Sequence, residues 1–232
     1  MNKSIISIVI ATATLSLLSG CGGGGGDGGS TTVTTNFPLQ VGYKARIAAG
    51  ATDNFTVSGT CAGSATFTSG AATAASFQSV AGFSVVQTAT VNVTNCIPST
   101  NAVTGTGYYD ANYSPLGSQI LGTEFTKYAA LPPAIPASVK VGDTAAYATL
   151  NVYTDSTMAT LTGQRFISYV IEGDGPNTAI ANLIAKSYNN AGQLLFTQQS
   201  RFRIAADGTL TAVSIDIQYS TTSTTHLLYT KS

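Results

Sequence analysis

Apolar and polar residues alternate along much of the chain with the period of two that is typical of β-strands. From Phe55 to Phe67 the odd positions are Phe, Val, Gly, Cys, Gly, Ala and Phe, whereas Ser, Thr and one Ala fill the even positions. The same phase resumes between Phe83 and Val93. Short strands of this kind, separated by Gly and Asn turns, favour an antiparallel β-sandwich-like domain over residues 37–130.

Three prolines lie within Leu131–Pro136, and so many missing N–H donors predict a linker over residues 131–139. Beyond it, alternation returns over residues 194–204 and 212–219, with the hairpin signal Asp207–Gly208 between them. The other predicted elements of this half are strands at 144–153, 165–172 and 225–230 and turns at Glu172–Gly175 and Asn189–Gly192.

Residues 177–188 could form a strand or a helix, because Ala179, Ile180, Leu183 and Ile184 also fit one face of a helix. A strand is favoured, which makes about six strands in this half. The sequence therefore predicts an all-β chain in which the sandwich-like domain is followed by an antiparallel β meander or half-barrel domain over residues 140–232.

Charged residues make up 9% of the 232 residues, with 10 basic and 10 acidic side chains and a net charge of zero. Soluble domains usually carry about 25%. A membrane-spanning protein or a fibre is not supported, because the chain has one long apolar run and no short repeat. Nucleic acid is not expected as a partner, since a phosphate-binding surface needs a basic excess.

The apolar run lies at the N-terminus, where Lys3 precedes residues 5–18 and the small residues Ser19 and Gly20 follow. This arrangement is typical of an export signal. As a helix the run would reach about 21 Å, short of the roughly 30 Å hydrocarbon core of a bilayer. We therefore expect the segment to be removed rather than kept as a membrane span.

Leu18, Ser19, Gly20 and Cys21 match the four positions of the lipobox, so this end of the chain resembles bacterial lipoproteins. The resemblance implies that residues 1–20 are a signal peptide and that Cys21 receives diacylglycerol and a further acyl chain such as palmitate. Gly22, where enteric lipoproteins of the inner membrane have Asp, implies the outer membrane, facing either the periplasm or the cell surface.

Residues 21–36 join the lipidation site to the rest of the chain. They are rich in Gly and Thr, a composition that predicts a flexible tether. Beyond this tether the chain resembles uncharacterised proteobacterial envelope lipoproteins of similar size.

With Cys21 assigned to lipid, Cys61 and Cys96 remain. An even number of cysteines in an exported chain favours a disulfide, which would stabilise the fold by roughly 4 kcal/mol. The alternative is that Cys61, within Gly59–Gly63, is a nucleophile. That motif needs a strand-to-helix turn, and the alternation of a strand continues through it, so the disulfide is favoured.

Candidate catalytic chemistry is sparse. His226 is the single histidine, and a zinc site needs three or four ligands, so no metal and no cofactor are expected. Glu124, Glu172 and Asp110 could serve an Asp/Glu-dependent hydrolase, but none lies in a recognisable motif. Glu172 and Asp174 flank one glycine, which is more typical of a solvated turn than of a calcium site.

Tyr108, Tyr109, Asp110 and Tyr113 form a possible ligand surface, because tyrosine rings stack on sugars and offer a hydrogen-bonding hydroxyl. The commoner alternative is that these tyrosines cover the core along an edge strand. Arg201 and Arg203 share the polar face of one predicted strand; they could bind an anion, or more commonly protect a strand edge.

These observations predict a lipid-anchored cell-envelope protein, a non-catalytic binding or structural module rather than an enzyme. The membrane would be its partner through the N-terminal lipid, and an unidentified envelope protein or a glycan would bind its hydroxyl-rich surface. Two alternatives stay open: a carrier of a small apolar ligand in the C-terminal β domain, and the Asp/Glu-dependent envelope hydrolase.

Overall fold

A computed structural model describes residues 35–96, 98–220 and 225–232. These ranges contain one helix, α1 (Leu39–Ala49), and thirteen strands. The strands are β1 (Ala51–Gly59), β2 (Ala62–Ser69), β3 (Thr73–Phe77), β4 (Val80–Thr94), β5 (Thr100–Asp110), β6 (Pro115–Ile120), β7 (Glu124–Tyr128), β8 (Thr144–Tyr153), β9 (Leu161–Gly175), β10 (Thr178–Asn189), β11 (Leu194–Ala205), β12 (Leu210–Tyr219) and β13 (His226–Lys231).

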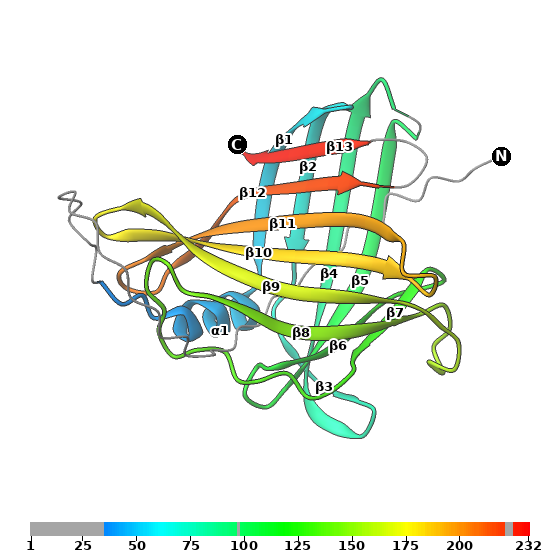
Figure 1. Cartoon of the computed structure of the whole chain (residues 1–232), viewed down its shortest axis with the longest axis horizontal. Coiled ribbons are helices and arrows are strands. Elements are labelled where there is room, and N and C mark those ends of the chain that lie inside the picture. Colours follow the sequence, from blue (N-terminus) through cyan, green and yellow to red (C-terminus); the bar gives the residue numbers. More distant parts are fainter. Residues whose placement is uncertain (1–34, 97, 221–224) are drawn as a thin grey trace.

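The strands form a closed antiparallel β-barrel. From β4 to β13 each strand pairs with the next one along the chain, β13 pairs with β1, and β1 pairs with β2. The pairing of β2 with β4 closes a ring of twelve strands in the described part of the chain, while β3 pairs with the first residues of β4 beside this ring. Figure 1 shows β8–β11 crossing in front of β1, β2, β4 and β5, so the two walls of the barrel run in different directions.

The all-β prediction is confirmed, but the sandwich followed by a meander or half-barrel is wrong. Alternation identifies which side chains face inward, and it does so equally for a sandwich and for a barrel. The pairing of Phe55 with Lys231, 176 positions apart in the numbering, joins the first wall to the last strand. Such a long-range pairing leaves no local signal in the sequence.

The strands predicted in the second half are present, but the turn predicted at Glu172–Gly175 is wrong, since β9 continues to Gly175 and the turn follows it. Residues 177–188 fall in β10, a strand and not a helix, with Ala179, Ala181 and Leu183 buried on its inner face. Asp207–Gly208 turns between β11 and β12, and the Gly208 φ of +89° explains why glycine stands there. Six strands, β8–β13, follow residue 140 in the described ranges, as predicted.

Side chains from both walls meet inside the barrel. One cluster joins Phe55 of β1 and Val91 of β4 to Phe196 of β11, Ile217 of β12 and Tyr229 of β13. A second cluster lies under β8–β11, and there the Pro-rich segment between β7 and β8 contributes the buried Ile135 and Val139. Val139 also pairs with Phe37, which fixes the start of the described chain against the barrel.

The predicted disulfide is confirmed. Cys61, in the turn between β1 and β2, bonds to Cys96, just after β4, with Cα atoms 5.8 Å apart. Because β2 and β4 are the strands whose pairing closes the ring, the covalent bond lies beside that closure.

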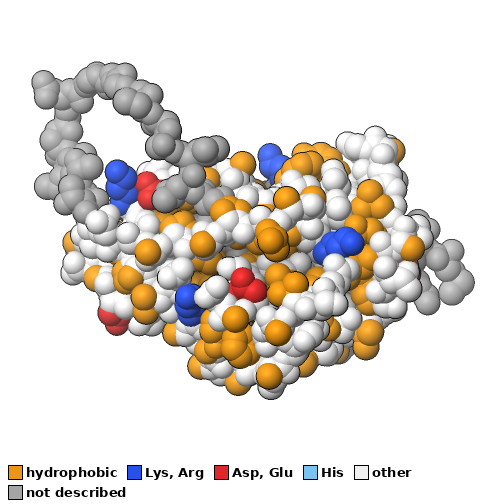
Figure 2. Space-filling model, turned by 90° about the horizontal axis from the view of Figure 1, so that it is seen from below, with side chains coloured by type: hydrophobic (Ala, Val, Ile, Leu, Met, Phe, Trp, Pro, Cys, Tyr) orange, Lys and Arg blue, Asp and Glu red, His pale blue; other side chains and the backbone are white. Residues whose placement is uncertain are grey.

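Hydroxyl groups occupy much of the outer surface, as the alternation predicted. Thr88 and Thr104 form a hydrogen bond between β4 and β5 at 3.2 Å, and Thr66 donates to Asn54 at 2.9 Å. Figure 2 shows few charged side chains on the face seen from below. No helix in the described ranges is both long enough and apolar enough to cross a bilayer.

Candidate ligand-binding site

The helix α1 lies against one end of the barrel. Leu39, Tyr43 and Ile47, four residues apart, share one helical face, and Leu39 and Ile47 are buried. Gly42 allows close contact with the β11–β12 turn, because a Cβ at this position would lie 1.8 Å from the Gly208 carbonyl oxygen. The helix can therefore pack directly against this turn.

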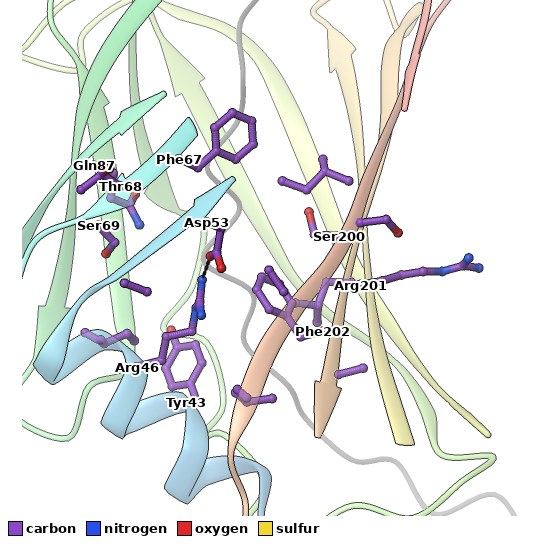
Figure 3. Close-up of a pocket in the computed structure, with 18 of the residues that line it drawn as sticks. Tyr43, Arg46, Asp53, Phe67, Thr68, Ser69, Gln87, Ser200, Arg201 and Phe202 are labelled. Atoms are coloured by element: carbon purple, nitrogen blue, oxygen red, sulfur yellow. Dashed lines mark hydrogen bonds and ion pairs between the residues drawn. The ribbon is translucent and has the colours of Figure 1, made fainter. Parts of the chain in front are cut away.

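A cavity of about 150 Å³ lies between α1 and the walls of the barrel (Figure 3). Most of its lining is apolar and comes from α1, β1, β2, β5, β10–β12 and the Pro-rich segment between β7 and β8. The apolar and aromatic side chains that line it are Leu39, Tyr43, Ile47, Ala51, Phe55, Phe67, Tyr109, Ile135, Ala181, Leu183, Phe202, Leu210, Ala212 and Ile215.

Three charged side chains meet at this cavity. Arg46 of α1 forms an ion pair with Asp53 of β1 through Nη2 and Oδ2, and the other carboxylate oxygen of Asp53 accepts a hydrogen bond from Lys231 Nζ at 2.8 Å. Arg46 and Asp53 line the cavity, and the Arg46 guanidinium also lies 5.4 Å from the ring centre of Phe202. This cluster ties the helix to the first and last strands.

Two neutral polar side chains of β11 face the same interior. Gln198 and Ser200 are 1% and 3% exposed, and Gln198 Nε2 donates to Ser200 Oγ at 3.0 Å. Both line the cavity. An apolar space with a few fixed hydrogen-bonding groups is the usual composition of a small-molecule site.

The hydroxyl of Tyr43 is a further polar group in the lining. It is buried and has no hydrogen-bond partner among the described residues. Burial, together with the nearby hydroxyls of Tyr109 and Tyr128, raises the pKa of Tyr43 well above its ordinary value. The group is therefore a neutral phenol at physiological pH, able to donate to or accept from a bound molecule.

The residues of the possible ligand surface predicted at 108–113 lie in different surroundings and do not form one surface. Tyr109 is 1% exposed and lines the cavity, while the Tyr108 ring stacks on Phe77 at 4.7 Å. Tyr113 stacks on Phe83 at 4.8 Å. Asp110 Oδ1 accepts hydrogen bonds from the backbone N–H groups of residues 112 and 114, both at 2.8 Å, and so holds the β5–β6 turn. The tyrosine of this group that reaches the cavity is therefore Tyr109, on β5 between β4 and β6.

The carboxylates considered for hydrolysis lie on different faces of the sheet. Glu124 lies on the inner face with Arg165, which donates to it at 2.9 and 3.3 Å. Glu172 lies on the outer face with Arg201, at 3.3 Å, and with Asn182, at 2.7 Å. The structure does not bring Glu124 and Glu172 together.

Arg201 and Arg203 lie on the outer face of β11, which has neighbours on both sides and is not an edge. Both reach across β10 to β9: Arg201 to Glu172, and Arg203 to Asp174 at 2.7 Å. The hydrogen bond from Arg203 holds the pKa of Asp174 below its ordinary value. The Glu172–Asp174 segment thus pairs with arginines across the sheet.

His226 lies on the outer face of β13, with Nε2 3.0 Å from Asp216 Oδ1. Among the residues that the structure describes, no three His, Cys, Asp or Glu side chains are grouped to hold a metal ion. Cys21, the predicted lipidation site, lies outside the described residues. Comparison of the chain with protein-family models, with curated proteins and with solved structures returns no match.

Sequence patterns missed the four lining residues of α1, Leu39, Tyr43, Arg46 and Ile47, because the helix was not predicted. The spacing of four between Leu39, Tyr43 and Ile47, directly after Pro38, is a helix signal that could have found it. The helix covers three turns only and has Gly42 inside it, which weakens that signal.

Proposed function

We propose that this chain is a binding protein that takes up a small, largely apolar ligand in the cavity beneath α1. The cavity itself carries the proposal. Protein interiors normally leave few voids larger than a water molecule, and empty apolar cavities of roughly 150 Å³ accept molecules of the size of benzene. The lining combines aromatic surface with Gln198, Ser200 and the Tyr43 hydroxyl.

The cavity is not confined to the C-terminal half, where the sequence suggested a carrier site as an alternative. Phe55 and Phe67 come from β1 and β2, whereas Ala181, Phe202 and Ala212 come from β10–β12. A ligand would therefore contact both walls and the helix at once. Binding would stabilise the closed barrel as a whole, because the bound molecule interacts with the folded state alone.

Thermal unfolding of the full chain with toluene tests the cavity. We expect toluene to raise the melting temperature and glycerol, a polar molecule of comparable size, to leave it unchanged. Leu183→Ala enlarges the cavity and should increase the shift, whereas Ala181→Leu fills it and should abolish the shift. Ala102→Leu adds the same side chain at an exposed position of β5 and is the matched control. The absence of a toluene effect in both the natural chain and Leu183→Ala would contradict the proposal.

We further propose that the chain acts at the outer membrane as a lipid-anchored protein, with Cys21 acylated. The lipobox supports this location, and Gly-rich sequence separates Cys21 from the start of α1 along the chain. Labelled palmitate supplied to an expressing bacterium should enter the natural chain and Cys61→Ser but not Cys21→Ser. Equal labelling of Cys21→Ser would exclude this anchor.

A further inference from the structure

The charged cluster at the cavity holds one more positive charge than negative charge. Arg46 and Lys231 are both paired with Asp53, whose side chain is 11% exposed and whose two carboxylate oxygens are both engaged. The side chains of Arg46 and Lys231 are 25% and 35% exposed, so the cluster is only partly hydrated. One positive charge is therefore left without a carboxylate beside a mostly apolar space.

The other ion pairs of the barrel do not share this imbalance. On the inner face Arg165 and Glu124 are paired one to one, and on the outer face Arg203 is paired with Asp174. Asp110, the further carboxylate close to Tyr43, is held by backbone N–H groups of its own turn and does not line the cavity. Among the ion pairs of the described residues, the cluster at the cavity is thus the one in which two cations share a single carboxylate.

Arg46 and Lys231 are partly exposed, so water offsets part of the excess charge, and an anionic group bound at Arg46 would offset it further. Arg46 and Arg201 are the cationic residues of the lining, and the Arg201 side chain points away from the cavity. The planar guanidinium of Arg46 has five N–H donors, and Nη2 donates to Asp53. The remaining donors match the geometry of a second carboxylate. Figure 3 shows Arg46 beside the cavity, between Asp53 and the helix, and Arg201 directed away from it.

We propose that the natural ligand is an anionic amphiphile, a small monocarboxylate whose charged group binds Arg46 and whose apolar body lies between Phe67 and Phe202. This inference rests on the proposed function and adds the ligand class to it. Asp53 is a positioning residue, since it pairs with Arg46, and Lys231 in turn pairs with Asp53.

Isothermal titration of the full chain with benzoate, benzamide and benzylamine separates charge from shape, because all three carry the same ring. We expect benzoate to bind roughly tenfold more tightly than benzamide, as one charge-assisted hydrogen bond predicts, and benzylamine to bind most weakly. Arg46→Gln should bring the affinity for benzoate down to that for benzamide. Arg203→Gln, on the outer face of β11 and outside the cavity lining, should keep the preference and is the matched control.

Asp53→Asn gives a change in the opposite direction, because it removes the competing carboxylate and should tighten benzoate binding. Melting curves of each variant show whether it is folded. Equal affinities for benzoate and benzamide would overturn the anionic ligand and leave the proposed function standing. If none of the three probes binds while toluene still stabilises the chain, the anionic ligand is again overturned; if toluene also fails, both proposals fall.

Discussion

Arg165 and Glu124 form an ion pair on the inner face of the barrel, with Nη2 and Oε2 2.9 Å apart, although 41 positions separate them in the chain. Their side chains are 3% and 14% exposed. The Arg165 guanidinium also lies 5.4 Å from the ring centre of Phe196. The pair connects β7 to β9. The charge on either side chain would be poorly hydrated and unpaired if its partner were removed.

Glu124→Gln should therefore destabilise the protein strongly. It leaves the Arg165 charge buried without a carboxylate, and losses of about 3 kcal/mol are typical of such a change. Urea unfolding measures it, since urea does not screen charge. Glu172→Gln on the outer face, where the partner Arg201 is 44% exposed, should cost less than about 1 kcal/mol and serves as the control. A loss of equal size in the two variants would show that burial of the inner pair is unimportant.

The disulfide should contribute substantially to stability, because it joins residues 35 positions apart beside the β2–β4 closure. Replacing Cys61 and Cys96 together by Ala should lower the free energy of unfolding by roughly 4 kcal/mol. Titration of free thiols in the unfolded, unreduced chain checks that the bond is present. Two reactive thiols at these positions would contradict it.

The same double replacement should leave toluene binding intact, because neither cysteine lines the cavity. A loss of binding in a chain that still unfolds cooperatively would mean that the disulfide, at the turn between β1 and β2, controls the shape of the site at a distance.

The sequence was sufficient for the strands of the second half and for the alternation in β1, β2 and β4, but it did not identify β6 or β7 and was insufficient for closure of the barrel. Alternation placed Phe55, Phe196 and Ile217 on buried faces, and that placement is the same in any two-sided sheet. The order of the strands depends on which edges meet, here β13 with β1 and β2 with β4. Those pairings are set by the packing of the whole interior and have no local pattern.

The candidate site was harder to predict for the same reason. Arg46 and Asp53 are seven residues apart, but Lys231 is 178 positions from Asp53 and reaches it because β1 and β13 are neighbours in the barrel. Tyr109 was identified, but as part of a surface, because alternation cannot tell an inner face from an outer one before closure is known. The cavity depends on volumes left between side chains, which no spacing rule contains.

Alkaline pH should weaken the fold through Tyr219. Burial raises the pKa of Tyr219 to about 12, whereas an unfolded chain has tyrosine pKa values near 10. Between these values the unfolded state loses the proton and the folded state keeps it, so the free energy of unfolding falls as pH rises. The stability from this group is complete below pH 10 and is lost as pH rises to about 12.

Tyr219→Phe should therefore unfold less readily than the natural chain at alkaline pH. At neutral pH the two should be close in stability, because the buried hydroxyl has no hydrogen-bond partner among the described residues. Urea unfolding across this pH range, with tyrosinate absorbance followed in parallel, measures both. If the two chains lose stability identically with pH, Tyr219 ionises as freely in the folded state as in the unfolded one.

Gly42→Ala should separate the contribution of α1 from that of the barrel. A Cβ at residue 42 would lie 1.8 Å from the backbone oxygen of Gly208, so the helix must shift away from the β11–β12 turn. Overpacking of this kind typically costs about 1–3 kcal/mol and outweighs the gain of up to about 1 kcal/mol in helix propensity. Because the helix lines the cavity, the variant should also bind toluene more weakly.

Gly173→Ala, whose Cβ would meet only Val141 at 3.7 Å, should change neither property. Unchanged toluene binding in a destabilised Gly42→Ala chain would show that the cavity tolerates displacement of its helix.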